Sequence, residues 1–125
     1  MLIVHFDGSF RKGCGYYGYV VSYNGKRVAA CAGMCDAHTN NAAEYEALLM
    51  AVRWVITNCK DVNEIVFKGD SALVIKQMTG VYGVKSRTSK TYVPIIRELL
   101  KGKTVRFVWV PRERNGEADA LSRSS

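Results

Sequence analysis

Hydrophobic and polar positions repeat along the chain with two periods, and each period predicts one kind of element. Short apolar runs rich in β-branched and aromatic residues predict strands at 1–6, 16–23, 26–33, 64–68 and 104–110. Apolar residues at helical spacing predict helices over 39–59, 72–78, 92–101 and 116–123. The resulting order, βββαβααβα, predicts one α/β domain over residues 1–125 with a mixed sheet.

The first three predicted strands form an antiparallel meander. Asn24-Gly25 is typical of a type I′ turn between the second and third strands. The glycine-rich stretch 8–15 predicts a turn directly after Asp7, and Asp-Gly is itself a common hairpin sequence. Taken alone, Asp7 is therefore interpreted as an ordinary turn acid.

A second strand-acid-serine sequence changes that interpretation. The strand at 64–68 leads into Gly69-Asp70-Ser71, and the long helix before it predicts a right-handed crossover that makes this strand parallel to the first. If the two strands are neighbours, Asp7 and Asp70 lie side by side at their carboxyl ends. Two such acids repel each other, and a bound cation or a raised pKa relieves the repulsion.

The remaining segments are predicted to be more exposed. The basic stretch 79–90 has no apolar period and is predicted to be a solvated loop. In the helix that follows, Pro94 is tolerated only in the first turn, so the helix is predicted to begin near Tyr92. Arg106 within the last strand predicts an exposed face or an edge of the sheet.

Composition and charge narrow the classes of protein. A chain of 125 residues with 48% apolar content can bury one core, and its 18 Lys and Arg against 11 Asp and Glu give a net charge of +7. This excess suits a polyanionic partner, although it also aids solubility. No apolar run approaches the roughly 20 residues of a membrane span, and the N-terminus does not resemble a secretory signal, so we expect a cytoplasmic protein. Because the sequence begins at Met1 just before the first strand, we expect a separate protein rather than a domain of a larger reverse transcriptase.

The four cysteines do not predict a metal site. None of the pairs has the C-x2-C spacing of a zinc knuckle, and Cys31 and Cys35 with His38 nearby form only a weak metal pattern. Free thiols in a reducing compartment are the favoured interpretation, and a disulfide stays open.

Four acids are each predicted at a strand end or a helix start. They are Asp7, Glu44, Asp70 and Asp119. This topology brings all four to one end of the sheet, where hard carboxylate oxygens suit Mg²⁺ or Mn²⁺. Two ions about 3.5–4 Å apart between such acids activate a water and stabilise a leaving oxygen in phosphodiester cleavage. Glu44 alone would otherwise be an ordinary acid of a helix N-terminus, but an acidic pocket on a basic chain indicates a metal-dependent nuclease.

Four segments of the sequence then resemble a known family. Asp7-Gly8-Ser9, Thr39-Asn40-Asn41-Ala42-Ala43-Glu44, Gly69-Asp70-Ser71 and Asn115-Gly116-Glu117-Ala118-Asp119-Ala120-Leu121 are similar, in order and spacing, to the four acidic motifs of type 1 ribonuclease H. The resemblance implies a five-stranded sheet of order 3-2-1-4-5. It also implies hydrolysis of the RNA strand of RNA/DNA hybrids by two metal ions, leaving 5′-phosphate and 3′-hydroxyl ends. Cleavage of double-stranded RNA and a non-catalytic hybrid-binding module are the alternatives.

The resemblance implies a role for each matching residue. Asp7 would bridge two Mg²⁺ or Mn²⁺ ions, Glu44 and Asp70 would hold one, and Asp119 would hold the other. Thr39 would contact a DNA phosphate, and Asn40 and Asn41 would contact the minor groove, with helix capping as the alternative. Contacts to nucleic acid are further expected from Ser9, Ser71, Lys85, Arg87 and Lys90.

Three departures from the family pattern set further expectations. Ala72 stands where many members have Gln, and the loop 111–115 lacks the His thought to help product release. Arg112 or Arg114 could replace that His as a phosphate-binding cation. The basic protrusion is reduced to 79–90, as in compact archaeal and viral members, and we expect a monomer.

Overall fold

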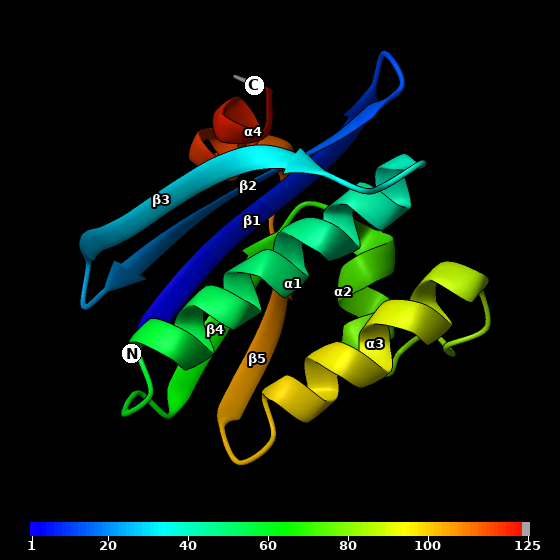
Figure 1. The fold of residues 1–125 in the computed structure, drawn as a ribbon. Helices are drawn as coiled ribbons and strands as arrows, with labels where there is room; N and C mark the ends of the chain where they lie inside the picture. Colours follow the sequence, from blue (N-terminus) through cyan, green and yellow to red (C-terminus); the bar gives the residue numbers. More distant parts are fainter. Residues whose placement is uncertain (124–125) are drawn as a thin grey trace.

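The computed structural model describes residues 1–123, which form a five-stranded mixed sheet covered by helices on both faces (Figure 1). The strands are β1 (Leu2–Arg11), β2 (Cys14–Tyr23), β3 (Lys26–Cys35), β4 (Glu64–Gly69) and β5 (Thr104–Trp109). The helices are α1 (Asn40–Asn58), α2 (Ala72–Met78), α3 (Arg87–Leu99), the 3₁₀ turn η1 (Arg112–Arg114) and α4 (Gly116–Arg123). The sheet order β3-β2-β1-β4-β5 and the element order confirm the predicted fold.

The pairing of the strands explains where the sheet opens. β1 pairs antiparallel with β2 along its whole length, from Leu2 to Arg11. Its parallel pairing with β4 is much shorter and ends at His5, opposite Lys68. Beyond His5, no strand within residues 1–123 pairs with β1 on its β4 side, so side chains from both faces of the sheet can meet there.

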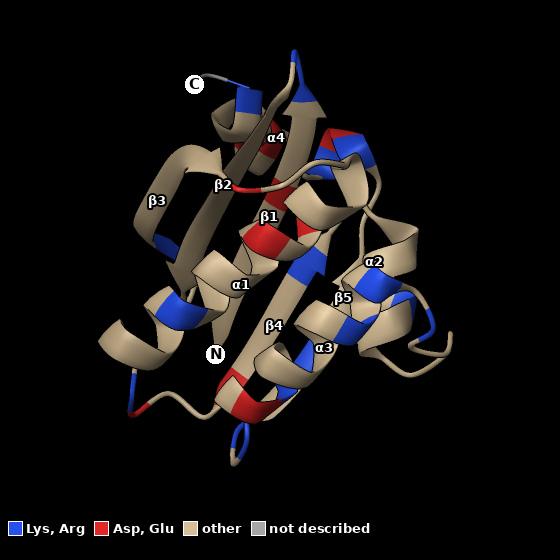
Figure 2. Cartoon of the chain, turned by 45° about the vertical axis from the view of Figure 1, so that its right-hand side comes forward, with Lys and Arg blue, Asp and Glu red and all other residues tan. Residues whose placement is uncertain are grey.

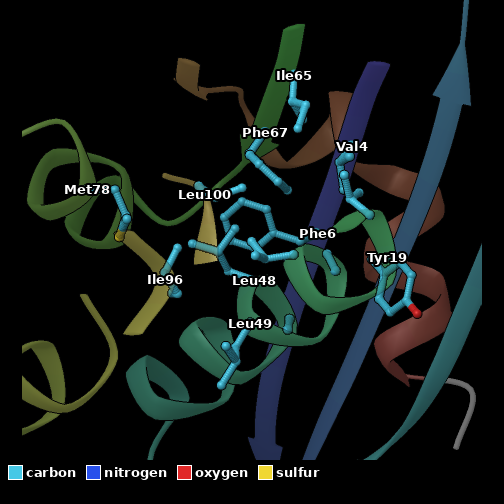
Figure 3. Close-up of a cluster of buried hydrophobic side chains, with 14 of the residues drawn as sticks. Val4, Phe6, Tyr19, Leu48, Leu49, Ile65, Phe67, Met78, Ile96 and Leu100 are labelled. Atoms are coloured by element: carbon cyan, nitrogen blue, oxygen red, sulfur yellow. The ribbon is translucent and has the colours of Figure 1, made fainter. Parts of the chain in front are cut away.

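The core lies between the sheet and α1, with α2 and α3 beside that helix (Figures 1 and 3). Val4 and Phe6 of β1 and Phe67 of β4 are fully buried against Leu48 of α1. Burying a side chain of this size contributes about 1.5–3 kcal/mol. The most deeply buried strands are therefore β1 and β4, which provide a rigid base for the residues that follow them.

The predicted turn after Asp7 is wrong. β1 continues to Arg11, and the chain turns at Lys12 and Gly13, whose φ angles are 53° and 79°. Gly8 serves close packing instead, because a Cβ on this residue would lie 2.0 Å from the carbonyl oxygen of Ala43 in α1. The second turn is confirmed, with Asn24 and Gly25 at φ 51° and 81°.

The start of α3 also differs from its prediction. The helix begins at Arg87, and Ser86 caps it by accepting a hydrogen bond from the amide of Ser89 at 3.0 Å. Pro94 therefore lies inside the helix, where it removes the amide hydrogen that would bind the carbonyl of Lys90. Because Lys90 is exposed, water can satisfy that carbonyl.

The prediction for the last strand is confirmed. β5 is an edge strand, and Arg106 on it is exposed. All four cysteines are free thiols. In the part of the chain that the structure describes, no helix has both the length and the apolar content needed to cross a bilayer.

Candidate active site

Three carboxylates from three elements meet where the sheet opens. Asp7 comes from β1, Glu44 from the beginning of α1, and Asp70 from the residue after β4. Their ligand oxygens lie within 4.8 Å of one another. Gly8 makes the meeting possible, because α1 approaches β1 closely enough for the amide of Gly8 to donate to Glu44 Oε1 at 2.5 Å.

Burial makes this cluster electrostatically unfavourable without a cation. Asp7 is 5% exposed and Glu44 is 8% exposed. Burial and the neighbouring charge of Asp70 raise the pKa of Asp7 to about 7. Burial and the charge of Asp7 raise the pKa of Glu44 well above its usual value. A cation placed among these oxygens would stabilise their ionised forms.

Asp119 lies at the border of the cluster. It lines the same hollow of about 210 Å³ as the other three acids, but stands outside the group whose oxygens lie within 4.8 Å. Its carboxylate Oδ1 lies 3.4 Å from Arg112 and 3.0 Å from Arg123. Partial burial works against ionisation of Asp119, but its hydrogen bonds to Arg123 and Asp7 and the two arginine charges hold its pKa below the usual range.

The donor set fits a divalent cation. Carboxylate oxygens at this spacing are the ligands that Mg²⁺ and Mn²⁺ prefer. A second polar group also faces the hollow: within residues 1–123, the buried hydroxyl of Ser9 has no hydrogen-bond partner. The hollow therefore offers both charged ligands and an unused hydroxyl.

The residues expected to contact nucleic acid are placed beside this hollow or on the surface. Thr39 caps α1 by accepting from the amide of Ala42 at 3.0 Å, so its capping role is confirmed. Asn40 lines the hollow, and its Oδ1 accepts from the amide of Phe10 at 2.8 Å, which ties α1 to β1. Ser71 caps α2 through the amide of Val74 at 3.3 Å. Asn41, next to Asn40, is partly exposed in the first turn of α1.

The cationic residues separate into two locations. Arg112 lines the acidic hollow, whereas Arg114 lines a different hollow with His5 and Ser22. Lys85, Arg87 and Lys90 are exposed in the loop before α3 and in its first turn, outside the acidic hollow. Figure 2 shows positions of Lys and Arg along α2, α3 and the connection between them, and positions of Asp and Glu on β1 and α1.

Three side chains near the acids were not predicted to hold them. The side-chain amide of Asn115, the residue before α4, donates to Phe6 O at 2.9 Å and to Asp70 Oδ2 at 3.3 Å. The indole of Trp109 donates to the carbonyl of Asp70 at 3.1 Å. The hydroxyl of Ser122 donates to Asp7 Oδ2 at 2.9 Å. Only Ser122 carried a pattern that could have revealed it, since it follows Asp119 by three residues on one helix face.

Known proteins are similar to this chain in sequence and fold. A family model described as reverse transcriptase-like matches residues 5–125. Ribonuclease HI of Halobacterium salinarum is 37% identical over 94% of this chain and 60% of its own length. The first two curated relatives are matched over 60% and 57% of their length, so the chain spans about three fifths of each.

Solved structures agree with the sequence matches. The crystal structure of RNase H1 from Halobacterium salinarum NRC-1 has a TM-score of 0.88 at 34% identity, covering 97% of this chain and 93% of that one. The structure of LC11-RNase H1 in complex with an RNA/DNA hybrid has a TM-score of 0.91 at 31% identity, covering 100% and 96%.

Proposed function

Because the chain belongs to the type 1 ribonuclease H family, we propose that it is an endoribonuclease that hydrolyses the RNA strand of RNA/DNA hybrids. We further propose that it uses two Mg²⁺ or Mn²⁺ ions and leaves 5′-phosphate and 3′-hydroxyl ends. The hybrid bound in the LC11-RNase H1 structure supports this substrate.

One observation supports catalysis over mere binding. Asp7, Glu44 and Asp70 converge within 4.8 Å although burial disfavours their charges. A binding module would gain nothing from this repulsion, whereas a nuclease needs these ligands. The acidic residues are therefore the strongest support for an enzyme.

Asp7, Glu44, Asp70 and Asp119 would hold the divalent ions. When bound, these ions supply activation of the attacking water and stabilisation of the leaving oxygen. Asp7 would be the shared ligand, because its carboxylate lies close to those of Glu44 and Asp70 and is also hydrogen-bonded to Asp119. The rigid β1 strand would keep that shared ligand in place.

The polar residues around the acids would orient the substrate. The unpartnered Ser9 hydroxyl can donate to a phosphate or ribose oxygen over the hollow. With its Oδ1 held by Phe10, Asn40 keeps its amide hydrogens for the hybrid, beside Thr39 and Asn41. Ser71 would contact the nucleic acid beside Asp70. Hydrogen bonds to 2′-hydroxyls would distinguish RNA from DNA.

The basic residues would bind the phosphate backbone at two places. Lys85, Arg87 and Lys90 would contact the DNA strand away from the reacting phosphate, and Arg112 would contact a phosphate at the hollow. Arg112 also binds Asp119, so it could assist product release by exchanging that carboxylate for a phosphate. Arg114 is the less suitable of the two arginines because it lines the other hollow.

Cleavage of labelled duplexes tests the proposal. RNA/DNA, RNA/RNA and DNA/DNA duplexes are incubated with Mg²⁺, with Mn²⁺ and with a chelator. We expect divalent-dependent cleavage of the RNA strand of the hybrid, with loss of at least about 10³-fold in rate for Asp7→Asn or Asp70→Asn, since each removes a ligand charge needed in the transition state.

A matched variant controls for loss of charge. Asp61→Asn removes an exposed carboxylate that lines a separate hollow, so it should cleave at the wild-type rate. Cleavage of RNA/RNA at a rate similar to the hybrid would favour the broader substrate range. Full activity of Asp7→Asn, or cleavage of DNA/DNA alone, would overturn the proposal.

A further inference from the structure

Ser122 approaches the acidic cluster from the opposite face of the sheet to Glu44. Ser122 belongs to α4 and Glu44 to α1, and these helices cover opposite faces (Figure 1). The Ser122 side chain is completely buried, and its hydroxyl oxygen lies 2.9 Å from Asp7 Oδ2. Being fully buried, it cannot touch a substrate.

The sheet is shaped to admit this contact. Gly18 of β2 lies directly opposite Asp7 in the β1–β2 pairing. A Cβ on Gly18 would lie 2.7 Å from the amide nitrogen of Ser122 and 2.8 Å from the carbonyl of Ala118. The missing side chain thus lets α4 pack on the sheet closely enough for Ser122 to reach Asp7.

The hydroxyl has one proton and two acceptors. Besides Asp7 Oδ2, the carbonyl oxygen of Asp119 lies 2.9 Å from the Ser122 oxygen. An ionised carboxylate is the stronger acceptor, and a metal ligand must be ionised. The proton therefore goes to Asp7 when a cation is bound, and it fixes one carboxylate oxygen while leaving the remaining lone pairs free.

We propose that Ser122 is a positioning residue that orients the Asp7 carboxylate for divalent-cation binding. The inference rests on the proposed function, because it assigns Asp7 as a metal ligand. Groups that hydrogen-bond to a metal ligand without touching the metal typically change metal affinity or activity by 10- to 100-fold when removed. Ser122 would affect cation binding only through Asp7, and it would make no contact with the hybrid.

Mn²⁺ binding to the substrate-free chain tests this role. Free Mn²⁺ is measured by electron paramagnetic resonance for the wild type, Ser122→Ala and Ser122→Cys. We expect Ser122→Ala to bind Mn²⁺ about 10-fold more weakly, and Ser122→Cys to be intermediate because a thiol is a weak donor. In cleavage assays, the lost rate should return at high metal concentration while the KM for the hybrid stays within about twofold of wild type.

Ser89→Ala is the matched control. Ser89 is equally buried, and its hydroxyl bonds to Ser86 at the start of α3 rather than to an acid. Ser89→Ala should lower the melting temperature without changing Mn²⁺ affinity. If Ser122→Ala behaves in the same way, the positioning role is wrong, and Ser122→Cys decides the question if the alanine variant does not fold.

The two proposals fail differently. A wild-type chain that binds Mn²⁺ but cleaves no duplex would contradict the proposed function and leave the Ser122 contact testable by Mn²⁺ affinity. A wild-type chain that cleaves hybrids, together with unchanged Mn²⁺ binding by both Ser122 variants, would overturn the positioning role alone.

Discussion

Asp7 combines a buried position with the charge that its proposed role as a metal ligand requires. It is 5% exposed and shares its surroundings with Glu44 and Asp70. Burial and the Asp70 charge raise its pKa to about 7, while the hydrogen bond from Ser122 works in the other direction. Between the ordinary value of 3.8 and the raised pKa of about 7, the metal-free folded chain therefore holds a proton at Asp7 that the unfolded chain releases.

This pKa predicts how the stability of the metal-free chain depends on pH. Because the folded pKa of Asp7 exceeds its ordinary value of 3.8, the stability is fully present at pH 4 and is lost as the pH rises toward 7. A shift of this size corresponds to a loss of about 4 kcal/mol in the free energy of unfolding. Urea denaturation in a chelator between pH 4 and 8 measures it.

Asp7→Asn is the comparison for that measurement. This substitution removes the titrating group and one repulsive charge. The stability of the variant should therefore fall less than that of the wild type over the same pH range. Saturating Mg²⁺ should restore the stability of the wild type at pH 8, because it binds the folded state alone. Parallel pH curves for the two proteins would contradict the raised pKa of Asp7.

Gly8 allows α1 to pack closely against β1. Its φ is not among the positive values found at Gly13, Gly25, Gly80 and Gly102. A Cβ on Gly8 would meet the Ala43 carbonyl at 2.0 Å and the Glu44 amide at 2.6 Å, both of them backbone atoms. Space, not backbone conformation, therefore requires glycine at this position.

Gly8→Ala should accordingly displace α1 and weaken the site. We expect a loss of about 3 kcal/mol or more in stability, seen as a fall of about 10 °C or more in melting temperature, because helix backbone cannot yield as a side chain can. Mn²⁺ affinity should fall as well, since Glu44 moves with α1. At Gly116 an added Cβ meets nothing within 4 Å among residues 1–123 apart from its chain neighbours and the nearby backbone of its own helix, so Gly116→Ala should change neither.

Gly8 also illustrates which features of the fold could be predicted from the sequence and which could not. The periodicity of apolar residues was enough for the element order, and the repeated strand-acid-serine sequence with its crossover brought Asp7 to Asp70. The strand order came from the resemblance to type 1 ribonuclease H. The same Asp7-Gly8 pair predicted a turn, because local sequence cannot distinguish a glycine that bends the chain from one that admits a helix. Pro94 misled in a similar way: the Ser86 cap and the packing of Val93 and Ile96 outweigh its missing hydrogen bond. The three-residue spacing from Asp119 places Ser122 near the acids, but its contact with Asp7 spans 115 positions of sequence, and local spacing does not predict that contact.

Across the whole molecule, acidic and basic residues separate in space. The acids gather beyond the carboxyl end of β4, beside the part of β1 that extends past its pairing with β4, and the exposed cations Lys85, Arg87 and Lys90 lie near the start of α3 (Figure 2). With a net charge of +7, the chain attracts a polyanion as a whole. Only the local cations, however, would form contacts with particular phosphates.

Salt dependence of hybrid binding separates those two contributions. Each phosphate contact adds about 0.9 to the slope of log affinity against log salt, so replacing Lys85, Arg87 and Lys90 by Ala should reduce that slope by about 2–3. Fluorescence anisotropy of a labelled hybrid in a chelator, at several KCl concentrations, measures the slope without cleavage.

An equal loss of charge elsewhere provides the control. Lys26, Lys60 and Lys101 are exposed. Lys26 is the first residue of β3, and Lys60 and Lys101 precede β4 and β5, so all three lie toward the Leu2 end of β1 and away from Asp7. Replacing these three by Ala removes the same net charge but should leave the slope unchanged, because only released counterions at contacted phosphates set it. Equal slopes in the two triple variants would show that the net charge, rather than the residues at the start of α3, binds the hybrid.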